Sequence, residues 1–401
     1  MTTKPALGNS EFICLFAMIT SLTALSIDTM LPALPAIAQG FALGDIKDTQ
    51  LVISALVLGM VGGELIFGPL SDACGRKFAI LSGMLVFIVG CLISMFATSY
   101  EWMLFGRVIQ GLGVSGPKIA SRALVRDQYV GAAMARIMSF IMMFFILVPM
   151  LAPALGALIL SLGDWHAIFL AFICMTLICG VWLAVRQPET LTKERRIPFN
   201  LSLLMQNSKR ILRHRRVMSY ATTAGILFGA LLLFIGMSQA IFADIYAIVD
   251  DFPLYFAILA SGVGLSSFIN GKLVMRFGMY KLSVIAFCAM TLFSTALLAV
   301  SAAHAGHPPL LWFMGLSFLS FCCVGMLFGN LNAMAMESLG KTAGLGASII
   351  GSASSLVSVF FSVSLGRFYN ETSYPLVIGF IIAGVMGLTL VIKAQRLPSE
   401  L

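Results

Sequence analysis

Residues 68–77 read GPLSDACGRK, and this short charged stretch decides the fold because of what surrounds it. Two glycines, a proline, an acid and two bases stand together, with mainly apolar runs at 50–70 and 78–98 on either side. About 20 mainly apolar residues are enough to cross a bilayer as a helix. The stretch therefore predicts a tight connection between two spanning helices, with Gly75 permitting the reversal.

The composition points to a membrane protein. Of 401 residues, 59% are hydrophobic and 10% are charged, whereas a soluble domain carries about 25% charged residues. The first apolar run, 12–34, is too long for the core of a cleaved signal peptide, so we expect it to be retained as a span. The eight cysteines show neither metal-ligand spacing nor a disulfide framework.

Runs of spanning length recur along the chain and predict an all-α polytopic membrane protein with twelve transmembrane helices. They cover approximately 12–34, 50–70, 78–98, 103–124, 137–160, 165–185, 217–243, 252–273, 279–302, 310–334, 343–365 and 375–394.

The basic residues predict the orientation. With the N-terminus in the cytoplasm, 21 of the 25 Lys and Arg residues fall on the cytoplasmic side, and only Lys47 and Arg367 fall outside. Positive residues collect on the cytoplasmic side of membrane proteins, so both termini are expected there. The net charge of +8 is thus a topology signal, and we expect no nucleic-acid partner.

The halves of the chain are related to each other. GKLVMRFGMYK (271–281) repeats the glycine spacing of GPLSDACGRK, with Gly271 and Gly278 matching Gly68 and Gly75. A repeated turn at corresponding places indicates a duplicated unit. We expect an N-terminal six-helix half at 1–186, a basic cytoplasmic linker at 187–216 and a C-terminal six-helix half at 217–401.

Three motifs carry a family resemblance. GPLSDACGRK resembles the signature between helices two and three of the major facilitator superfamily, and LFGRVIQGLGVS (104–115) resembles its fourth-helix signature. VPMLAPALGALI (148–159) resembles the fifth-helix motif of the drug:proton antiporters. With LSIDTMLPALPAI (25–37) and WHAIF (165–169), the whole chain resembles the bicyclomycin-resistance (Bcr/CflA) branch.

The resemblance implies two pseudo-symmetric six-helix halves and multidrug efflux by proton antiport with alternating access. It also implies a cytoplasmic gate. That gate would comprise Gly68, Asp72, Gly75, Arg76 and Arg122. Asp72 stands near Arg76 at a helix end, where the residues equally support a capped connection or a latch that breaks as the halves rock. Four residues depart from the family pattern. They are Ala73 in the gate signature, Glu64, Lys118 and His166.

Charges inside the spans are the candidate functional residues, because a charge at the bilayer centre costs about 2.5–3.5 kcal/mol on insertion scales. Only two acids, Asp28 and Glu64, lie well inside spans, together with Arg107 and Lys118. Counting residues places Asp28 and Arg107 ~24 and ~25 Å from the inner face, so the two could meet. Glu64 and Lys118 also share a level.

Proton coupling follows if Asp28, Glu64 and Arg107 change surroundings during transport. The proton affinity of a carboxyl depends on its hydration and on nearby charge. An acid whose environment alternates can therefore bind a proton on one side and release it on the other. The alternative is a buried ion pair that only orients helices one and four.

Other polar residues are candidates for the substrate cavity or for the moving parts. Arg107, Lys118, Gln239 and Asn330 are the cavity candidates, although hydrogen bonding between helices is an alternative for the two amides. Pro149, Pro153 and Gly156 in the fifth span suit a hinge or a tight seal. Proline frees backbone groups there, and glycine permits close helix approach.

The sequence favours a secondary transporter of the bacterial inner membrane that exports small molecules as a monomer. The alternative is a dedicated exporter of an anionic metabolite, such as a carboxylate siderophore, because Arg107 and Lys118 lie eleven residues apart on one helix face. No nucleophile–base pair, metal cluster or phosphate loop is visible, which argues against an enzyme. We expect no cofactor and a proton gradient as the energy source.

Overall fold

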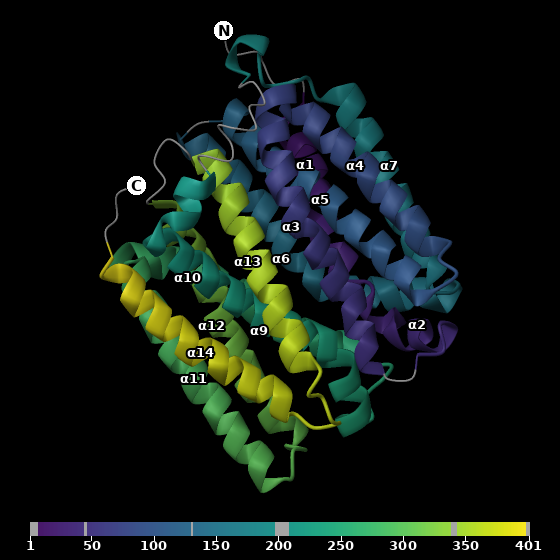
Figure 1. Ribbon diagram of the computed structural model, residues 1–401, viewed down its shortest axis with the longest axis vertical. Coiled ribbons are helices and arrows are strands. Elements are labelled where there is room, and N and C mark those ends of the chain that lie inside the picture. The colour runs from purple at the N-terminus through teal and green to yellow at the C-terminus, as the bar shows by residue number, and fades with distance from the viewer. Residues whose placement is uncertain (1–6, 44–45, 130, 197–207, 338–342, 398–401) are drawn as a thin grey trace. The chain divides into compact units, whose positions relative to one another are not determined.

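The computed structural model describes residues 7–43, 46–129, 131–196, 208–337 and 343–397, and the regular elements in these ranges are helical (Figure 1). The chain divides into two compact units. The first comprises Met1–Ile37 and Ala55–Asn207, and the second Ala38–Ser54 and Ser208–Leu401. The division at 207 falls inside the basic segment 187–216, while the grouping of 38–54 with the second unit had no counterpart in the sequence prediction.

The helices before the division are six long ones with short helices between them. They are α1 (Asn9–Asp28), η1 (Leu31–Ala33), α2 (Leu34–Gly40), η2 (Ile46–Thr49), α3 (Gln50–Cys74), α4 (Arg76–Met95), α5 (Tyr100–Gln128), α6 (Gly131–Leu162), α7 (His166–Arg186) and η3 (Lys193–Arg195). The later helices are again six long ones. They are α9 (Arg215–Tyr246), α10 (Phe252–Phe277), α11 (Met279–Ala303), α12 (Leu310–Glu337), α13 (Ala343–Gly366) and α14 (Tyr374–Gln395).

The same packing scheme recurs in both units. In the first, α1 packs against α6, and α4 packs against α5 and α7. In the second, α9 packs against α13, and α11 packs against α12 and α14, as Figure 1 shows for α11 and α14. Corresponding helices of the two halves thus have corresponding partners, which confirms the predicted pseudo-symmetric duplication.

The helices match the predicted spans. Within the described residues, ten helical segments are long and apolar enough to cross a membrane. The remaining two long helices are α5, which carries the basic residues Arg107 and Lys118, and α6, whose described apolar part is Met150–Leu162. The most buried spans, Asn9–Gly40 and α9, are 72% buried, whereas α10 is 28% buried. The apolar residues that α10 exposes suit contact with lipid.

Two helix boundaries differ from the predicted ones. The first span is broken after Asp28, where α1 gives way to a turn and a short 3-10 helix. Pro32 explains the break, since it has no N–H to bond the Asp28 carbonyl one turn earlier. Conversely, α3 continues through Pro69 to Cys74, so the connection to α4 shrinks to Gly75.

Gly75 makes the reversal that the sequence predicted. Its φ of 116° lies in the region that favours glycine, and it is the residue before α4. Gly278, its counterpart in the repeat, has φ 78° and precedes α11 in the same way. The two connections therefore share a backbone conformation as well as a sequence spacing.

Candidate functional site

Helix α5 carries three of the candidate residues, Arg107, Lys118 and Arg122, and lies in backbone contact with α3 and α4. A Cβ atom at Gly63 on α3 would lie 2.4 Å from the Leu112 carbonyl oxygen, and one at Gly113 on α5 would lie 2.3 Å from the Phe87 nitrogen on α4. Helices approach this closely only where side chains are absent. The glycines therefore fix the positions of the charges that α3 and α5 carry.

Arg107 is fully buried and joins three helices. Its Nη2 donates to the Ser26 carbonyl oxygen on α1 at 2.7 Å, and its Nη1 donates to Gln110 Oε1 at 2.9 Å. Gln110 Nε2 in turn donates to Cys91 Sγ on α4 at 2.8 Å. The guanidinium thus ties α1 to α5 inside the first unit.

Asp28 is the last residue of α1, and its side chain is 3% exposed. Its Oδ1 atom has no hydrogen-bond partner within the described part of the chain. Arg107 contacts α1 two residues before Asp28, at Ser26. The structure therefore places the two residues at the predicted shared level, but the contact it shows runs through the Ser26 carbonyl rather than through an Asp28–Arg107 ion pair.

Glu64 on α3 and Lys118 on α5 form a direct ion pair. Lys118 Nζ donates to Glu64 Oε1 at 2.6 Å. The carboxylate side chain is 2% exposed and the lysine side chain 28% exposed, while Glu64 Oε2 has no hydrogen-bond partner among the described residues. Arg122, one turn further along α5, is exposed.

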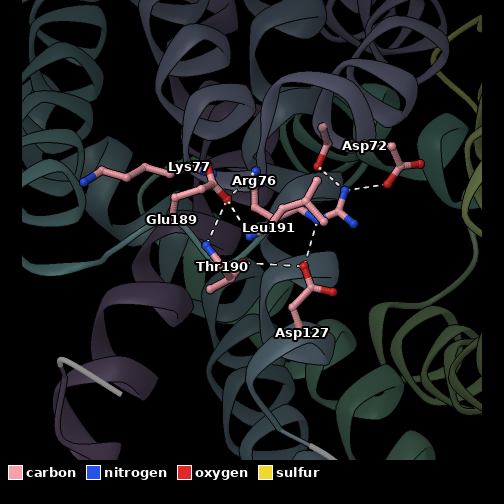
Figure 2. Close-up of polar contacts among 8 residues, drawn as sticks. Asp72, Arg76, Lys77, Asp127, Glu189, Thr190 and Leu191 are labelled. Atoms are coloured by element: carbon pink, nitrogen blue, oxygen red, sulfur yellow. Dashed lines mark hydrogen bonds and ion pairs between the residues drawn. The ribbon is translucent and has the colours of Figure 1, made fainter. Parts of the chain in front are cut away.

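Arg76 is the centre of an ionic cluster where α3 and α5 end and α4 begins, which we call the basic end of the first unit. Its Nη1 donates to Asp72 Oδ1 and to Ser71 Oγ, and its Nε donates to Asp127 Oδ2 at 2.9 Å. Figure 2 shows the guanidinium held between the two carboxylates. The helix containing Gly68 is thereby joined to α5 through a buried cation.

Glu189, just beyond α7, caps the start of α4. Its Oε1 accepts from the Arg76 N–H at 2.9 Å, and its Oε2 accepts from the Lys77 N–H at 3.1 Å. Figure 2 shows the same carboxylate bonded to the N–H groups of Thr190 and Leu191. A carboxylate at a helix N-terminus satisfies free donors and complements the helix dipole.

Asp127 and Glu189 are functional candidates that the sequence reasoning missed. Asp127 follows Arg126 at the end of the fourth predicted span, and an acid at that depth is a natural partner for the bases of GPLSDACGRK. Glu189 gives a weaker signal, because it lies 113 positions from Arg76 in an irregular segment. A similar missed contact joins Glu11 on α1 to Arg186 on α7 through two hydrogen bonds of 2.9 Å.

The proline- and glycine-rich helix α6 packs closely against the break in the first span. A Cβ at Gly156 would lie 2.2 Å from the Thr29 carbonyl oxygen and 2.8 Å from Pro32. Pro153 is buried on the same helix, whereas the side chain of Pro149 lies outside the described residues. The contact suits the predicted seal, since it sits one residue beyond Asp28.

The amides of the second unit play different roles. Asn330 on α12 and Asn270 on α10 exchange hydrogen bonds of 2.9 and 3.1 Å, and both residues are buried. Gln239 on α9 has a buried Oε1 atom with no hydrogen-bond partner among the described residues. The structure thus places Asn330 in an interhelical pair, while Gln239 retains a free acceptor.

His166, at the opposite end of the first unit, is tied to Asp164. Its Nδ1 lies 2.8 Å from Asp164 Oδ2, and its backbone N–H donates to Oδ1 at 3.0 Å. Partial desolvation opposes ionisation of this carboxyl, but the hydrogen bonds and charge of His166 prevail and lower its pKa. Asp164 is therefore a fixed negative charge at neutral pH.

Within the described residues, a duplicated fold of twelve long helices with buried charges inside the spans is that of a membrane transporter. Residues 16–364 match the family model of the Major Facilitator Superfamily. The chain belongs to this superfamily, and the family predicted from the motifs is confirmed.

Proteins from several bacteria are similar over most of the chain. The uncharacterized MFS-type transporter YdgK of Bacillus subtilis is 29% identical over 364 residues, covering 90% of this chain and 89% of that protein. The bicyclomycin resistance protein homolog of Haemophilus influenzae is 27% identical over 369 residues, covering 91% of each. The chloramphenicol resistance protein CraA of Acinetobacter baumannii is 26% identical, covering 62% of each. These matches are consistent with the bicyclomycin-resistance branch.

Solved structures agree on the fold. A crystal structure of the D-xylose–proton symporter has a TM-score of 0.74 at 15% identity and covers 97% of this chain and 98% of that one. At this identity the likeness concerns the fold alone. The chain therefore has the 12-helix architecture of its superfamily. Its membership of that superfamily makes it a multi-pass membrane transporter.

Proposed function

We propose that this transporter exports drug-like small molecules across the bacterial inner membrane in exchange for protons. The observation that carries the proposal is Asp28, a buried carboxyl with a free oxygen at a break in the first span. A discontinuous helix inside the membrane is a recurrent place for coupling ions in secondary transporters. The resistance relatives support drugs as the substrates.

Proton binding is assigned to Asp28, with Glu64 as a second proton-binding site. Arg107 is assigned as the group that responds when Asp28 is protonated. Because Arg107 holds the Ser26 carbonyl, protonation two residues away alters the charge that the guanidinium experiences. Repacking of α1 against α5 would then follow. Asp28 and the substrate path open alternately to each side of the membrane, so a proton enters as a substrate molecule leaves.

The basic end is assigned to the gate that closes the cytoplasmic side. Arg76 links Asp72 to Asp127, and Gly75 keeps the turn tight enough for Glu189 to reach α4. Gly68 lies on α3 just before this cluster. Pro149, Pro153 and Gly156 of α6 are assigned to the opposing seal. Lys118, Arg107, Gln239 and Asn330 are assigned to the substrate path.

The remaining features of the proposal concern the whole protein. The halves 1–186 and 217–401 rock about the substrate path, joined by the linker 187–216. Both termini are cytoplasmic, the protein acts as a monomer, and the proton gradient supplies the energy without a cofactor.

Transport into inverted membrane vesicles tests the proposal. Respiration acidifies the vesicle lumen, and chloramphenicol uptake is followed with radiolabelled drug. Vesicles containing the protein should accumulate drug and lose it when a protonophore is added. Asp28→Asn should abolish accumulation while retaining drug binding. Accumulation that survives the protonophore, or wild-type uptake by Asp28→Asn, would overturn the proposal.

A further inference from the structure

Arg122, at the cytoplasmic end of the fourth predicted span, was predicted to belong to the gate, but none of the Arg76 contacts in the described residues involves it. It lies on α5 one turn beyond Lys118 and is exposed. Residues four apart on a helix are surface neighbours, with Cβ atoms about 6 Å apart. No hydrogen bond or ion pair occupies the Arg122 guanidinium in the part of the chain that the structure describes.

The charges of this cluster do not cancel. Lys118 and Arg122 are two cations, and Glu64 is one anion. An ammonium has three donors, of which the pair with Glu64 uses one, and a guanidinium has five. The Glu64 side chain is 2% exposed and the Lys118 side chain 28% exposed. An approaching ligand therefore meets the cationic donors, with a net charge of plus one.

Arg122 contributes to the cytoplasmic charge bias, but it lies deeper along its helix than bases such as Arg126 in the last turn of α5. Arg122 lies six residues before the end of α5, which is about 9 Å deeper. At that depth an unpaired charge is costly and marks a functional site by default.

We propose that Lys118 and Arg122 bind the acidic group of an organic monoanion, such as a carboxylate with an apolar body, as a transported substrate. This inference rests on the proposed export function and names its substrate class. A guanidinium binds a carboxylate through two parallel hydrogen bonds, and the neighbouring ammonium adds a third donor. Glu64 keeps Lys118 paired, so the site takes one negative charge rather than several.

Calorimetric titration of purified protein with matched probes tests the site. The probes are 2-naphthoate and its neutral amide, 2-naphthamide, which share one apolar body. Wild-type protein should bind the acid more tightly than the amide. Arg122→Gln should weaken naphthoate binding about tenfold or more, as expected for charge-assisted hydrogen bonds, and leave naphthamide unchanged. Arg122→Lys should retain most of the preference for the acid. Arg213→Gln removes an exposed arginine outside the cluster and should have no effect.

The outcomes separate this inference from the export proposal. Equal binding of the two probes by wild-type protein, or equal losses in Arg122→Gln and Arg213→Gln, would overturn the anion site. Proton-driven chloramphenicol uptake would be untouched by that result. Gel filtration and thermal unfolding identify a variant that fails to fold, in which case the charge-retaining Arg122→Lys carries the comparison. If it loses the preference for the acid while folded, the inference is also overturned.

Discussion

At the scale of single residues, the Glu64–Lys118 pair is unequally buried. The carboxylate side chain is 2% exposed and the ammonium side chain 28%. Removing one partner of a buried pair leaves the other charge uncompensated, and the cost depends on which charge remains. A stranded Glu64 cannot reach water, whereas a stranded Lys118 partly can.

We therefore predict that Lys118→Met is more destabilising than Glu64→Gln. The lysine variant should cost about 3–5 kcal/mol, the usual range for a stranded buried charge, and the glutamate variant about 1–3 kcal/mol. The double variant should recover part of the loss, since neither charge is then left alone. Unfolding of the purified proteins in detergent measures the stability of the wild type, the two single variants and the double variant. Simple additivity of the two losses would contradict a direct pair.

At the scale of elements, the repeat provides a matched comparison between two turns. Gly75 and Gly278 both have positive φ with an extended ψ, so a side chain at either position strains the backbone by about 1–3 kcal/mol. A Cβ at Gly75 would also lie 2.3 Å from Glu189 Oε2, whereas a Cβ at Gly278 meets nothing within 4 Å.

Gly75→Ala should therefore destabilise the protein more than Gly278→Ala, by about 1 kcal/mol for the helix cap that Glu189 provides. Thermal unfolding measures the difference. Adding Glu189→Gln should reduce stability less in Gly75→Ala than in wild-type protein, because the cap is already displaced. Equal losses at the two glycines would mean that Glu189 does not stabilise α4.

The elements also show what a sequence can and cannot predict. Hydropathy predicts the twelve spans because crossing the bilayer demands about 20 apolar residues whatever the packing. It does not predict the break after Asp28, since the residues on both sides are equally apolar. Depth along the membrane follows from counting, which placed Glu64 level with Lys118. Which side chains touch depends on how each helix is rotated about its axis, and counting residues does not give that rotation. Counting allowed Arg107 to meet Asp28, whereas the structure bonds it to the Ser26 carbonyl.

Contacts between distant segments lie beyond local patterns altogether. Asp127 and Glu189 reach Arg76 from 51 and 113 positions away. Nothing in the flanking residues specifies these pairings, because the carboxylates come within bonding distance of Arg76 only after the helices have packed. The motif residues of the gate, including Asp72, were predictable from the resemblance, whereas the other two acids bonded to Arg76, Asp127 and Glu189, were not.

At the scale of the whole molecule, the halves share a packing scheme but not their charges. The second and fourth helices of the first half are joined by an ion pair, Glu64–Lys118. Their counterparts in the second half, α10 and α12, are joined by the neutral amides Asn270 and Asn330. The deep carboxyls Asp28 and Glu64 also belong to the first half. Proton coupling is accordingly assigned to the first half. In the second half, the corresponding helix pair is held by uncharged amides.

The central claim is that substrate leaves in exchange for protons. The most direct test places purified protein in liposomes that contain a pH-sensitive dye and no initial pH gradient. Chloramphenicol is then added outside, so that its own gradient drives it inward. The account predicts that the lumen becomes more alkaline as protons leave against the entering drug, and that Asp28→Asn shows no change. Acidification of the lumen, which would mean that drug and proton move together, would contradict the account.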